Sequence, residues 1–216
     1  MEDIEAVGLL QDAVRRRLYE FVAAQGREVS RNEAAEAVGV ARTLAAFHLD
    51  RLAAAGLLET ASRRLSGRSG PGAGRPAKVY RRAAGERGVS LPPRDYRTAA
   101  ELLAEAAEDA RLDDAVRAAA RRRGAAAGPC RDEAEARARL TERGYEPFVD
   151  ADGDGGEVVR LRNCPFHALA EDFPPLVCGM NLALVEGLLG EGSGLVARMD
   201  ARAGLCCVAI SKNNEH

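Results

Sequence analysis

The chain contains no tryptophan among its 216 residues, and aromatic residues make up only 4% of it. Any hydrophobic core must therefore be filled mainly by leucine, valine and alanine. No apolar run approaches the roughly 20 residues that a membrane helix needs. The first ten residues, MEDIEAVGLL, are acidic and lack the basic start and apolar centre of a secretory signal. We therefore expect a cytoplasmic protein with no membrane partner.

The distribution of cysteine along the chain is uneven. The chain has five cysteines, and four of them lie between residues 164 and 207. Because thiols are kept reduced in the cytosol, free, metal-binding or redox-active cysteines are expected rather than a disulfide framework. Charge is uneven too: residues 1–90 carry 15 basic and 11 acidic side chains (+4), and residues 91–216 carry 16 and 22 (−6). This asymmetry fits an anion-binding front half joined to a different module.

Residues 10–59 have the pattern of a helix-turn-helix. The segment LQDAVRRRLYEFVAAQG predicts a helix that Gly26 stops, and Ser30 followed by Glu33 is a capping box for a second, short helix ending at Gly39. A third helix is predicted in ARTLAAFHLDRLAAAGLLE, which Gly56 ends. We expect its buried face to carry Leu44, Phe47, His48 and Leu52. Three helices in this order predict a DNA-reading domain.

The segment after the third helix reads as a strand, a loop rich in glycine and proline, and a second strand. Residues 61–82 carry seven basic side chains and no acid, as in a β-wing that touches DNA phosphates or the minor groove. The alternative is a helical hairpin with a solvated basic loop. His48 is either a packing residue or a base or phosphate contact. The predicted DNA-binding residues are Arg42, Thr43, Ala46 and Arg51 on the third helix, and Arg63, Arg64, Arg68, Arg75 and Lys78 in the wing.

Residues 89–144 are predicted to be a helical connector that also forms a dimer. Two prolines at 92 and 93 mark a domain boundary, and the helical region after them has an apolar stripe at Leu102, Leu103, Ala106, Ala110 and Val116. Helix-turn-helix proteins usually bind palindromic sites as dimers, so this stripe is the natural seam of a homodimer. The alternative is a linker helix that packs on its own domain.

Residues 145–216 are predicted to form antiparallel strands with one main helix. Cys164 lies on a loop, Cys178 in the first turn of that helix, and Cys206 and Cys207 in the last strand. A helix start favours thiolate at Cys178. Because neighbours in a strand point to opposite faces, only one of Cys206 and Cys207 is expected at a shared site. The alternative is a set of buried structural cysteines.

These segments together predict an α+β protein. It has a winged helix-turn-helix DNA-binding domain at 1–88, a helical dimerisation connector at 89–144 and a small α/β sensor domain at 145–216. The motifs RTLAAFHLDRLAAAGLLE, GRPAKVYR, CPF, VCGMNLALVEGLLG and CCV resemble the SufR family of DeoR/ArsR-like bacterial repressors of iron–sulfur cluster assembly genes.

The resemblance implies a homodimer that binds a double-stranded DNA operator and holds a [4Fe–4S] cluster in each subunit. The matching ligand positions are Cys164, Cys178 and Cys206, with Cys207 as a rival for the third place. His167 is the nearest candidate for the fourth ligand by sequence; a carboxylate (Glu171 or Asp172) or an exogenous ligand are the others. The cluster-loaded form is expected to repress and the apo form to release DNA.

Three other functions fit parts of the sequence. Three cysteines with one histidine also form a tetrahedral Zn²⁺ set. A thiol-redox regulator would pair Cys178 with a second thiol and bind no metal. An enzyme would use Cys178 as nucleophile with His167 as base, but no third orienting residue stands out and a helix-turn-helix argues against it.

Overall fold

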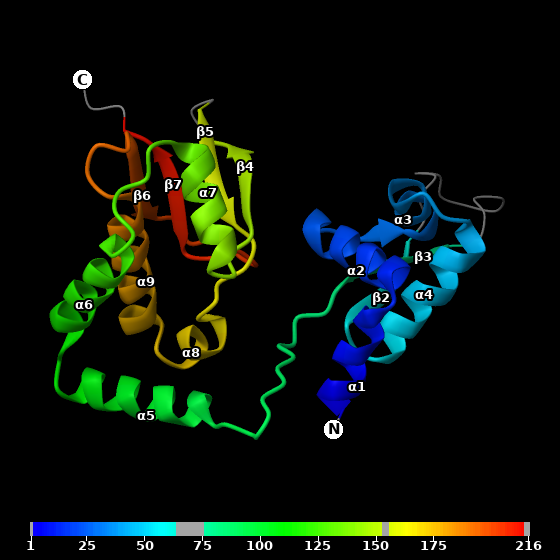
Figure 1. Ribbon diagram of the computed structural model, residues 1–216, viewed down its shortest axis with the longest axis horizontal. Coiled ribbons are helices and arrows are strands. Elements are labelled where there is room, and N and C mark those ends of the chain that lie inside the picture. The colour runs from blue at the N-terminus through cyan, green and yellow to red at the C-terminus, as the bar shows by residue number, and fades with distance from the viewer. Residues whose placement is uncertain (1, 64–75, 153–155, 214–216) are drawn as a thin grey trace. The chain divides into compact units, whose positions relative to one another are not determined.

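The computed structural model describes residues 2–63, 76–152 and 156–213, and the chain divides into two compact units, Met1–Arg94 and Asp95–His216 (Figure 1). The division follows the predicted prolines. Residues 95–144 do not stand apart as a connector, however, because their helices belong to the second unit. None of the described helices combines the length and hydropathy that a membrane span requires.

The first unit begins with helices and ends with a β-ribbon. Local signals set its helix ends as predicted: the Ser30 hydroxyl accepts a hydrogen bond from the Glu33 amide (3.2 Å), and Gly26 and Gly39 adopt the left-handed conformation that closes a helix. Asp12, which the pattern did not single out, caps the first long helix by accepting from the Arg15 amide (2.9 Å). The elements are α1 (Glu2–Gly8), a 3₁₀ turn η1 (Leu9–Gln11), α2 (Ala13–Gln25), β1 (Val29–Ser30), α3 (Arg31–Val38), α4 (Arg42–Ala54), β2 (Leu58–Arg63) and β3 (Ala77–Arg82).

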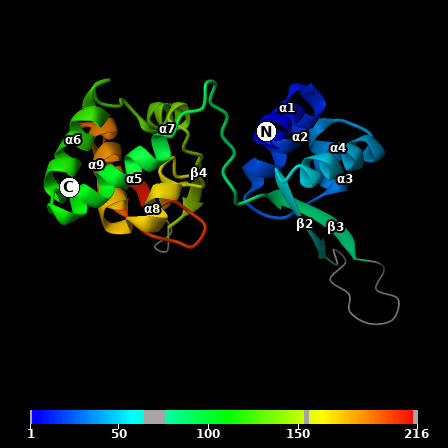
Figure 2. The same cartoon turned by 90° about the horizontal axis from the view of Figure 1, so that it is seen from below.

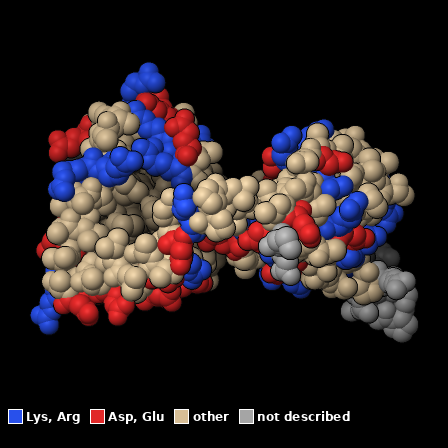
Figure 3. Space-filling view, turned by 60° about the horizontal axis from the view of Figure 1, so that its bottom comes forward, with Lys and Arg blue, Asp and Glu red and all other residues tan. Residues whose placement is uncertain are grey.

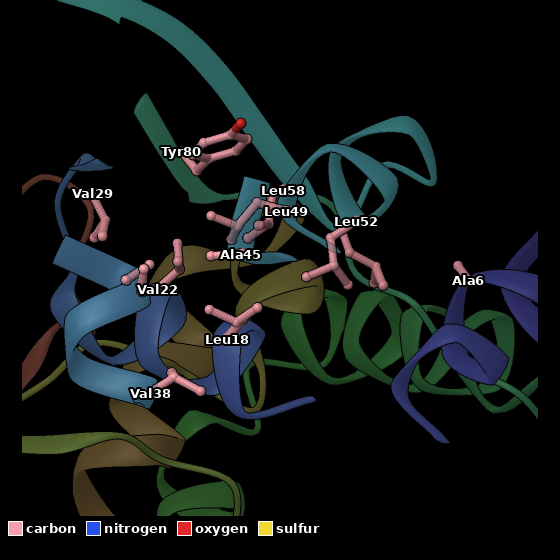
Figure 4. Packing of buried hydrophobic residues seen from close by; sticks show 13 residues of the cluster. Ala6, Leu18, Val22, Val29, Val38, Ala45, Leu49, Leu52, Leu58 and Tyr80 are labelled. Carbon is pink, nitrogen blue, oxygen red and sulfur yellow. The ribbon is translucent and has the colours of Figure 1, made fainter. Parts of the chain in front are cut away.

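The helices of the first unit enclose an aliphatic core with one buried tyrosine. Leu18 and Val22 of α2, Leu49 and Leu52 of α4 and Tyr80 of β3 point toward one another in this core (Figure 4). The predicted phase of α4 was partly wrong, because Leu44 and Phe47 are exposed. The buried positions of α4 are Ala45, His48, Leu49 and Leu52.

The predicted wing is present as an antiparallel ribbon. Strand β3 lies between β1 and β2, giving the sheet order β1-β3-β2, and β2 pairs with β3 from Leu58↔Arg82 to Arg63↔Ala77. Figure 2 shows β2 and β3 running out from the helices of this unit. The predicted loop residues Arg64, Arg68 and Arg75 lie outside the described residues.

The second unit is an antiparallel sheet with helices. Its sheet order is β4-β5-β7-β6, and a shared core from α7, α9 and one sheet face places both helices on that face. This matches the predicted antiparallel strands and main helix. The elements are α5 (Tyr96–Asp109), α6 (Asp113–Ala125), α7 (Glu133–Glu142), β4 (Pro147–Ala151), β5 (Glu157–Leu161), α8 (His167–Asp172), α9 (Pro174–Leu189), β6 (Leu195–Met199) and β7 (Val208–Lys212).

Helices α6 and α9 cross at two glycines, which explains why α6 belongs to the second unit. A Cβ atom on Gly124 would lie 2.1 Å from the Leu184 carbonyl oxygen, and one on Gly187 would lie 2.1 Å from the Arg121 carbonyl oxygen. Only residues without a side chain allow two backbones to approach this closely. The crossing therefore ties the helical segment to α9, the helix that carries Cys178.

The other face of the sheet carries a charged network centred on a buried arginine. Arg160 is 2% exposed and donates to the carboxylates of Asp150 (3.2 Å) and Asp200 (2.8 Å). Arg198 donates to Asp152 (3.0 Å) across the same sheet. These pairs satisfy the buried guanidinium, which would otherwise be costly to bury, and they tie β4, β5 and β6 together.

Helix α5 packs weakly on the rest of its unit. Ala104 is its buried residue, whereas Leu102 (61%) and Leu103 (72%) are largely exposed. Most of the predicted stripe on this helix therefore faces outward in the single chain.

Figure 3 also shows an uncharged hollow in the second unit, with Lys and Arg along one border.

Candidate DNA-binding face and thiol cluster

The exposed side of α4 is the first part of the candidate site. Arg42 and Thr43 are exposed at the N-terminal end of the helix, as predicted, and Ala46 is half-buried. Arg51 is exposed, and its guanidinium lies 5.6 Å from the centroid of the Phe47 ring. Arginine at this distance from an aromatic ring makes a cation–π contact. The helix thus presents basic and apolar groups side by side.

A cleft of ≈ 750 Å³ joins the start of α3, the start of α4 and the wing strands. Three cations line it, and none of the described residues that line it is acidic. Amides at a helix start and nearby cations both favour an anion. The cleft therefore has the chemistry of a phosphate-binding surface. Its lining residues are Ser30, Arg31, Asn32, Arg42, Thr60, Ala61, Ser62, Pro76, Ala77 and Lys78.

A polar network fixes the wing to α4 beside this cleft. The Asp50 carboxylate accepts hydrogen bonds from Lys78 Nζ (2.6 Å) and the Tyr80 hydroxyl (2.7 Å), and Arg31 Nε donates to the same hydroxyl (3.2 Å). Burial opposes ionisation of Asp50, but the bonds from Lys78 and Tyr80 outweigh it and hold the carboxyl pKa below its usual range. Burial, reinforced by Asp50, raises the pKa of Tyr80 to about 12. The network holds α3, α4 and β3 in fixed positions relative to one another.

The described basic residues of the wing have acidic partners within the first unit. Arg63 Nε pairs with Glu28 (2.7 Å), Lys78 with Asp50 (2.6 Å), and Arg81 with Glu59 (2.6 Å). Exposed ion pairs of this kind contribute about 0–1 kcal/mol, so phosphates can replace the carboxylates at little cost. Figure 3 shows basic and acidic side chains interspersed on the displayed face of this unit.

His48 is a packing residue, not a DNA contact. It is 5% exposed, and its Nδ1 accepts a hydrogen bond from Arg15 Nε (3.2 Å). Arg15 Nη1 also donates to the Leu9 carbonyl (3.0 Å). The pair therefore links α4 to α2 and to the turn before it.

The second candidate site lies in the other unit, where four thiols from three separate segments of the chain come together. The Cys164 side chain interacts with Cys206, Cys206 with Cys207, and Cys207 with Cys178. We call these four residues the thiol cluster. All five cysteines of the chain are free of disulfides. Cys130 is buried outside this chain of contacts, and its thiol donates to the Leu188 carbonyl (3.2 Å).

Asn181 is a buried polar residue against the thiol cluster that the sequence reasoning missed. It is 0% exposed, and its Nδ2 lies 3.2 Å from Cys206 Sγ and 3.9 Å from Cys164 Sγ. Its Oδ1 accepts a hydrogen bond from the buried Tyr145 hydroxyl (2.5 Å). The signal in the sequence was an amide three residues after Cys178, in a largely apolar helix whose one charged residue is Glu186. Donors beside ligand sulfurs hold them in place and tune their basicity.

The pKa values of the thiols shift in opposite directions within the thiol cluster. Hydrogen bonds from Cys164 and Cys207 lower the pKa of Cys206 well below that of an ordinary thiol, against the opposing effect of burial. The same bonds to Cys206, together with burial, raise the pKa values of Cys164 and Cys207. The Asn181 amide donates toward the same sulfur and lowers the pKa of Cys206 further.

Two expectations about this site differ from the structure. Cys206 and Cys207 both reach the thiol cluster, because strand β7 begins at Val208 and the alternation of a strand does not apply to them. Cys178 is the fifth residue of α9 and not in its first turn, because the helix already begins at Pro174. The His167 imidazole is exposed and lies 3.4 Å from Glu171, one helical turn away, while the His167 amide donates to the Cys164 carbonyl (3.0 Å).

The thiols contact one another in pairs and do not surround a common point. Within the described residues, no group of three or more His, Cys, Asp and Glu side chains is arranged to hold a metal ion. The donor set is nevertheless thiol-rich, and soft thiolate ligands suit iron–sulfur clusters and zinc. The residues present thus fit such a group in kind, with an amide donor already beside two of the sulfurs.

Comparison with known proteins supports the first site. A family model described as a helix-turn-helix domain matches residues 10–61, which covers α2 to the start of β2. No curated protein matches the chain, and no solved structure matches it either. The match and the β2–β3 ribbon identify a winged helix-turn-helix in the first unit. The domain indicates a DNA-binding transcriptional regulator.

Proposed function

We propose that this protein is a homodimeric repressor of iron–sulfur cluster assembly genes, whose operator binding depends on a [4Fe–4S] cluster held by Cys164, Cys178 and Cys206. The observation that carries the proposal is the contact between thiols from a loop, helix α9 and the segment before β7. Buried structural cysteines have no need to meet in this way.

Residues of the second unit have different roles in holding the iron–sulfur cluster. Cys164, Cys178 and Cys206 provide thiolates, and Cys207, in contact with both Cys178 and Cys206, is a fourth thiol at hand. Asn181 orients Cys206 and Cys164 through its amide. When bound, the cluster supplies a centre that oxidants or iron shortage can dismantle. With Cys207 unbound, one iron would lack a protein ligand and would be open to such loss.

Helix α9 offers a physical path from the thiols to the DNA-binding half. It carries both Cys178 and Asn181, and its Gly187 packs directly against the α6 backbone. Helix α5 precedes α6 and begins at Tyr96, just after the first unit ends at Arg94. A shift of α9 on ligand loss would therefore be passed through α6 to α5. Because half-site spacing is strict, a small change at a dimer seam on α5 would alter operator binding.

The test is anaerobic purification of the wild type and of single Cys→Ser variants at 164, 178, 206 and 207, with Cys130→Ser as the matched control. Visible absorption and iron and sulfide assays report the cluster. We expect the variants at 164, 178 and 206 to lose it, and Cys130→Ser to retain it. DNA binding is measured with duplexes that the loaded wild type enriches from a random pool. Apo-protein that binds these duplexes as tightly as the loaded form would overturn the proposal.

The same experiment distinguishes two other sensors. Colourless protein with stoichiometric zinc would indicate a zinc-binding regulator using the same thiolates. The direct contact of Cys164 with Cys206, and of Cys207 with Cys178, also suits a thiol-redox regulator. In that case mass spectrometry of oxidised, metal-free protein would find disulfides at these pairs.

A further inference from the structure

Two large apolar side chains stand on the outer face of α4. Leu44 is 41% exposed and Phe47 is 53% exposed, whereas the opposite face buries Ala45, Leu49 and Leu52. An α-helix turns about 100° per residue, which puts Phe47 near the middle of the exposed face and Leu44 beside it. Exposed apolar groups of this size are informative when they cluster on a surface.

The neighbours of these side chains belong to the candidate DNA-binding face. Thr43 is exposed next to Leu44, and the Arg51 guanidinium lies over the Phe47 ring. Arg42, one residue before Thr43, lines the cleft between α3, α4 and the wing. The apolar pair is therefore flanked by groups suited to phosphates and base edges. A helix-turn-helix domain inserts this helix into the major groove.

The major groove offers one apolar group, the 5-methyl of thymine. Phenylalanine and other apolar side chains recognise it by contact, whereas amide and guanidinium groups read hydrogen-bonding edges. Leu44 and Phe47 cannot form hydrogen bonds to bases through their side chains. Within a major groove, burial against thymine methyls is the contact that suits them.

We infer that Leu44 and Phe47 are specificity-determining residues that read thymine methyl groups in the operator. The inference rests on the proposed DNA binding and deepens it by naming what α4 recognises. Arg51 holds the Phe47 ring through its cation–π contact, and Arg42 and Thr43 anchor the helix start. Phosphate contacts fix register, and the apolar pair contributes the choice of base.

The test replaces thymine by deoxyuridine, which lacks only the 5-methyl group. Duplexes enriched from a random pool by the full-length wild type are resynthesised with single thymine-to-deoxyuridine changes. Losing one buried methyl contact should weaken wild-type binding by about fourfold at one or more positions. Phe47→Ala or Leu44→Ala should bind the thymine and deoxyuridine duplexes equally at the corresponding positions, and Phe47→Leu should retain part of the discrimination.

Two controls separate recognition from folding and from general affinity. Val7→Ala changes another exposed apolar residue of the first unit and should keep the full discrimination. Phe47→Ala should leave the salt dependence of binding unchanged, because that slope counts phosphate contacts. Circular dichroism checks that each variant is folded.

Several results would overturn the inference while leaving DNA binding intact. These are enriched sites without shared thymines, wild-type affinity indifferent to every deoxyuridine change, or discrimination retained in both alanine variants. A change of oligomeric state in Phe47→Ala with unchanged discrimination would instead mark this face as a contact between two copies of the chain. If the wild type enriches no duplex, the DNA-binding function itself fails.

Discussion

The side-chain amide of Asn181 lies 3.2 Å from the sulfur of Cys206, inside a helix whose other buried residues are apolar or glycine. The carbonyl oxygen of the same amide accepts a hydrogen bond from the Tyr145 hydroxyl. One side chain thus satisfies two buried polar groups from segments far apart in the chain. This relationship makes Asn181 the structural support of the thiol cluster.

Replacing Asn181 with leucine should destabilise the second unit even in the absence of metal. The change leaves the Tyr145 hydroxyl buried without its acceptor and removes the donor to Cys206, and an unsatisfied buried group costs about 1–3 kcal/mol. Denaturant unfolding of the reduced, metal-free protein measures this loss. Tyr145→Phe, which removes the hydroxyl and keeps the ring, is the matched control and should lose less. An Asn181→Leu variant as stable as the wild type would contradict the role of Asn181 as support of the thiol cluster.

Alanine at Gly187 should lower the free energy of unfolding by at least about 2 kcal/mol, because overpacking at a close backbone approach cannot be relieved by rotating a side chain. The added Cβ would meet the Arg121 carbonyl oxygen at 2.1 Å. Intrinsic propensity predicts the opposite sign, since alanine in a helix is favoured over glycine by about 1 kcal/mol. Gly156→Ala, whose nearest neighbour would be 3.9 Å away, is the control. A stabilised Gly187→Ala variant would rule out the tight crossing.

Acidification should protonate Asp50 and weaken its hydrogen bonds with Lys78 and Tyr80. The folded pKa of Asp50 lies below its unfolded value of about 3.9, so its stabilisation is complete above about pH 4 and is lost as pH falls through the folded pKa. The stability difference between wild type and Asp50→Asn should therefore shrink on acidification below pH 4. Thermal unfolding of the full chain at a series of pH values measures it. A difference that stays constant across that range would show that the Asp50 charge is not involved.

Paired glutamates at Leu102 and Leu103 should convert the proposed homodimer to monomer without unfolding the chain. Both side chains are largely exposed in the single chain, so their replacement disturbs little within it, whereas four charges would meet at a seam on α5. Analytical ultracentrifugation gives the oligomeric state. Val149→Glu, at an exposed apolar residue of β4, serves as the control. A wild type that stays monomeric at high concentration, or a variant that stays dimeric, would exclude this seam.

The DNA-binding unit was largely predictable because its signals are local. Ser30 with Glu33, and glycines after two of the helices, set boundaries within a few residues of the chain. The phase of α4 was less certain, because Ala45 and Ala46 provide little contrast and Phe47 and His48 are adjacent. The orientation of α4 is set by burial of His48 against Arg15, which lies 33 residues earlier.

The arrangement of the thiol cluster could not be predicted from local signals, because its residues come from separate segments of the chain. The four cysteines could be named as candidates from the sequence, but Cys206 and Cys207 were placed in a strand that begins only at Val208. His167 looked close to the site in sequence, yet its ring turns to Glu171 on its own helix. Sequence proximity says little about the direction of a side chain at a helix start.

By itself, the sequence determined the helix-turn-helix, the wing strands and the set of thiols, because caps, glycine stops and residue chemistry act over a few positions. Only the tertiary structure decided which thiols touch, that Asn181 supports them, and that Phe47 faces outward. Those outcomes depend on packing between elements far apart in the chain, where the fit of α9 against α6 and the sheet selects one arrangement.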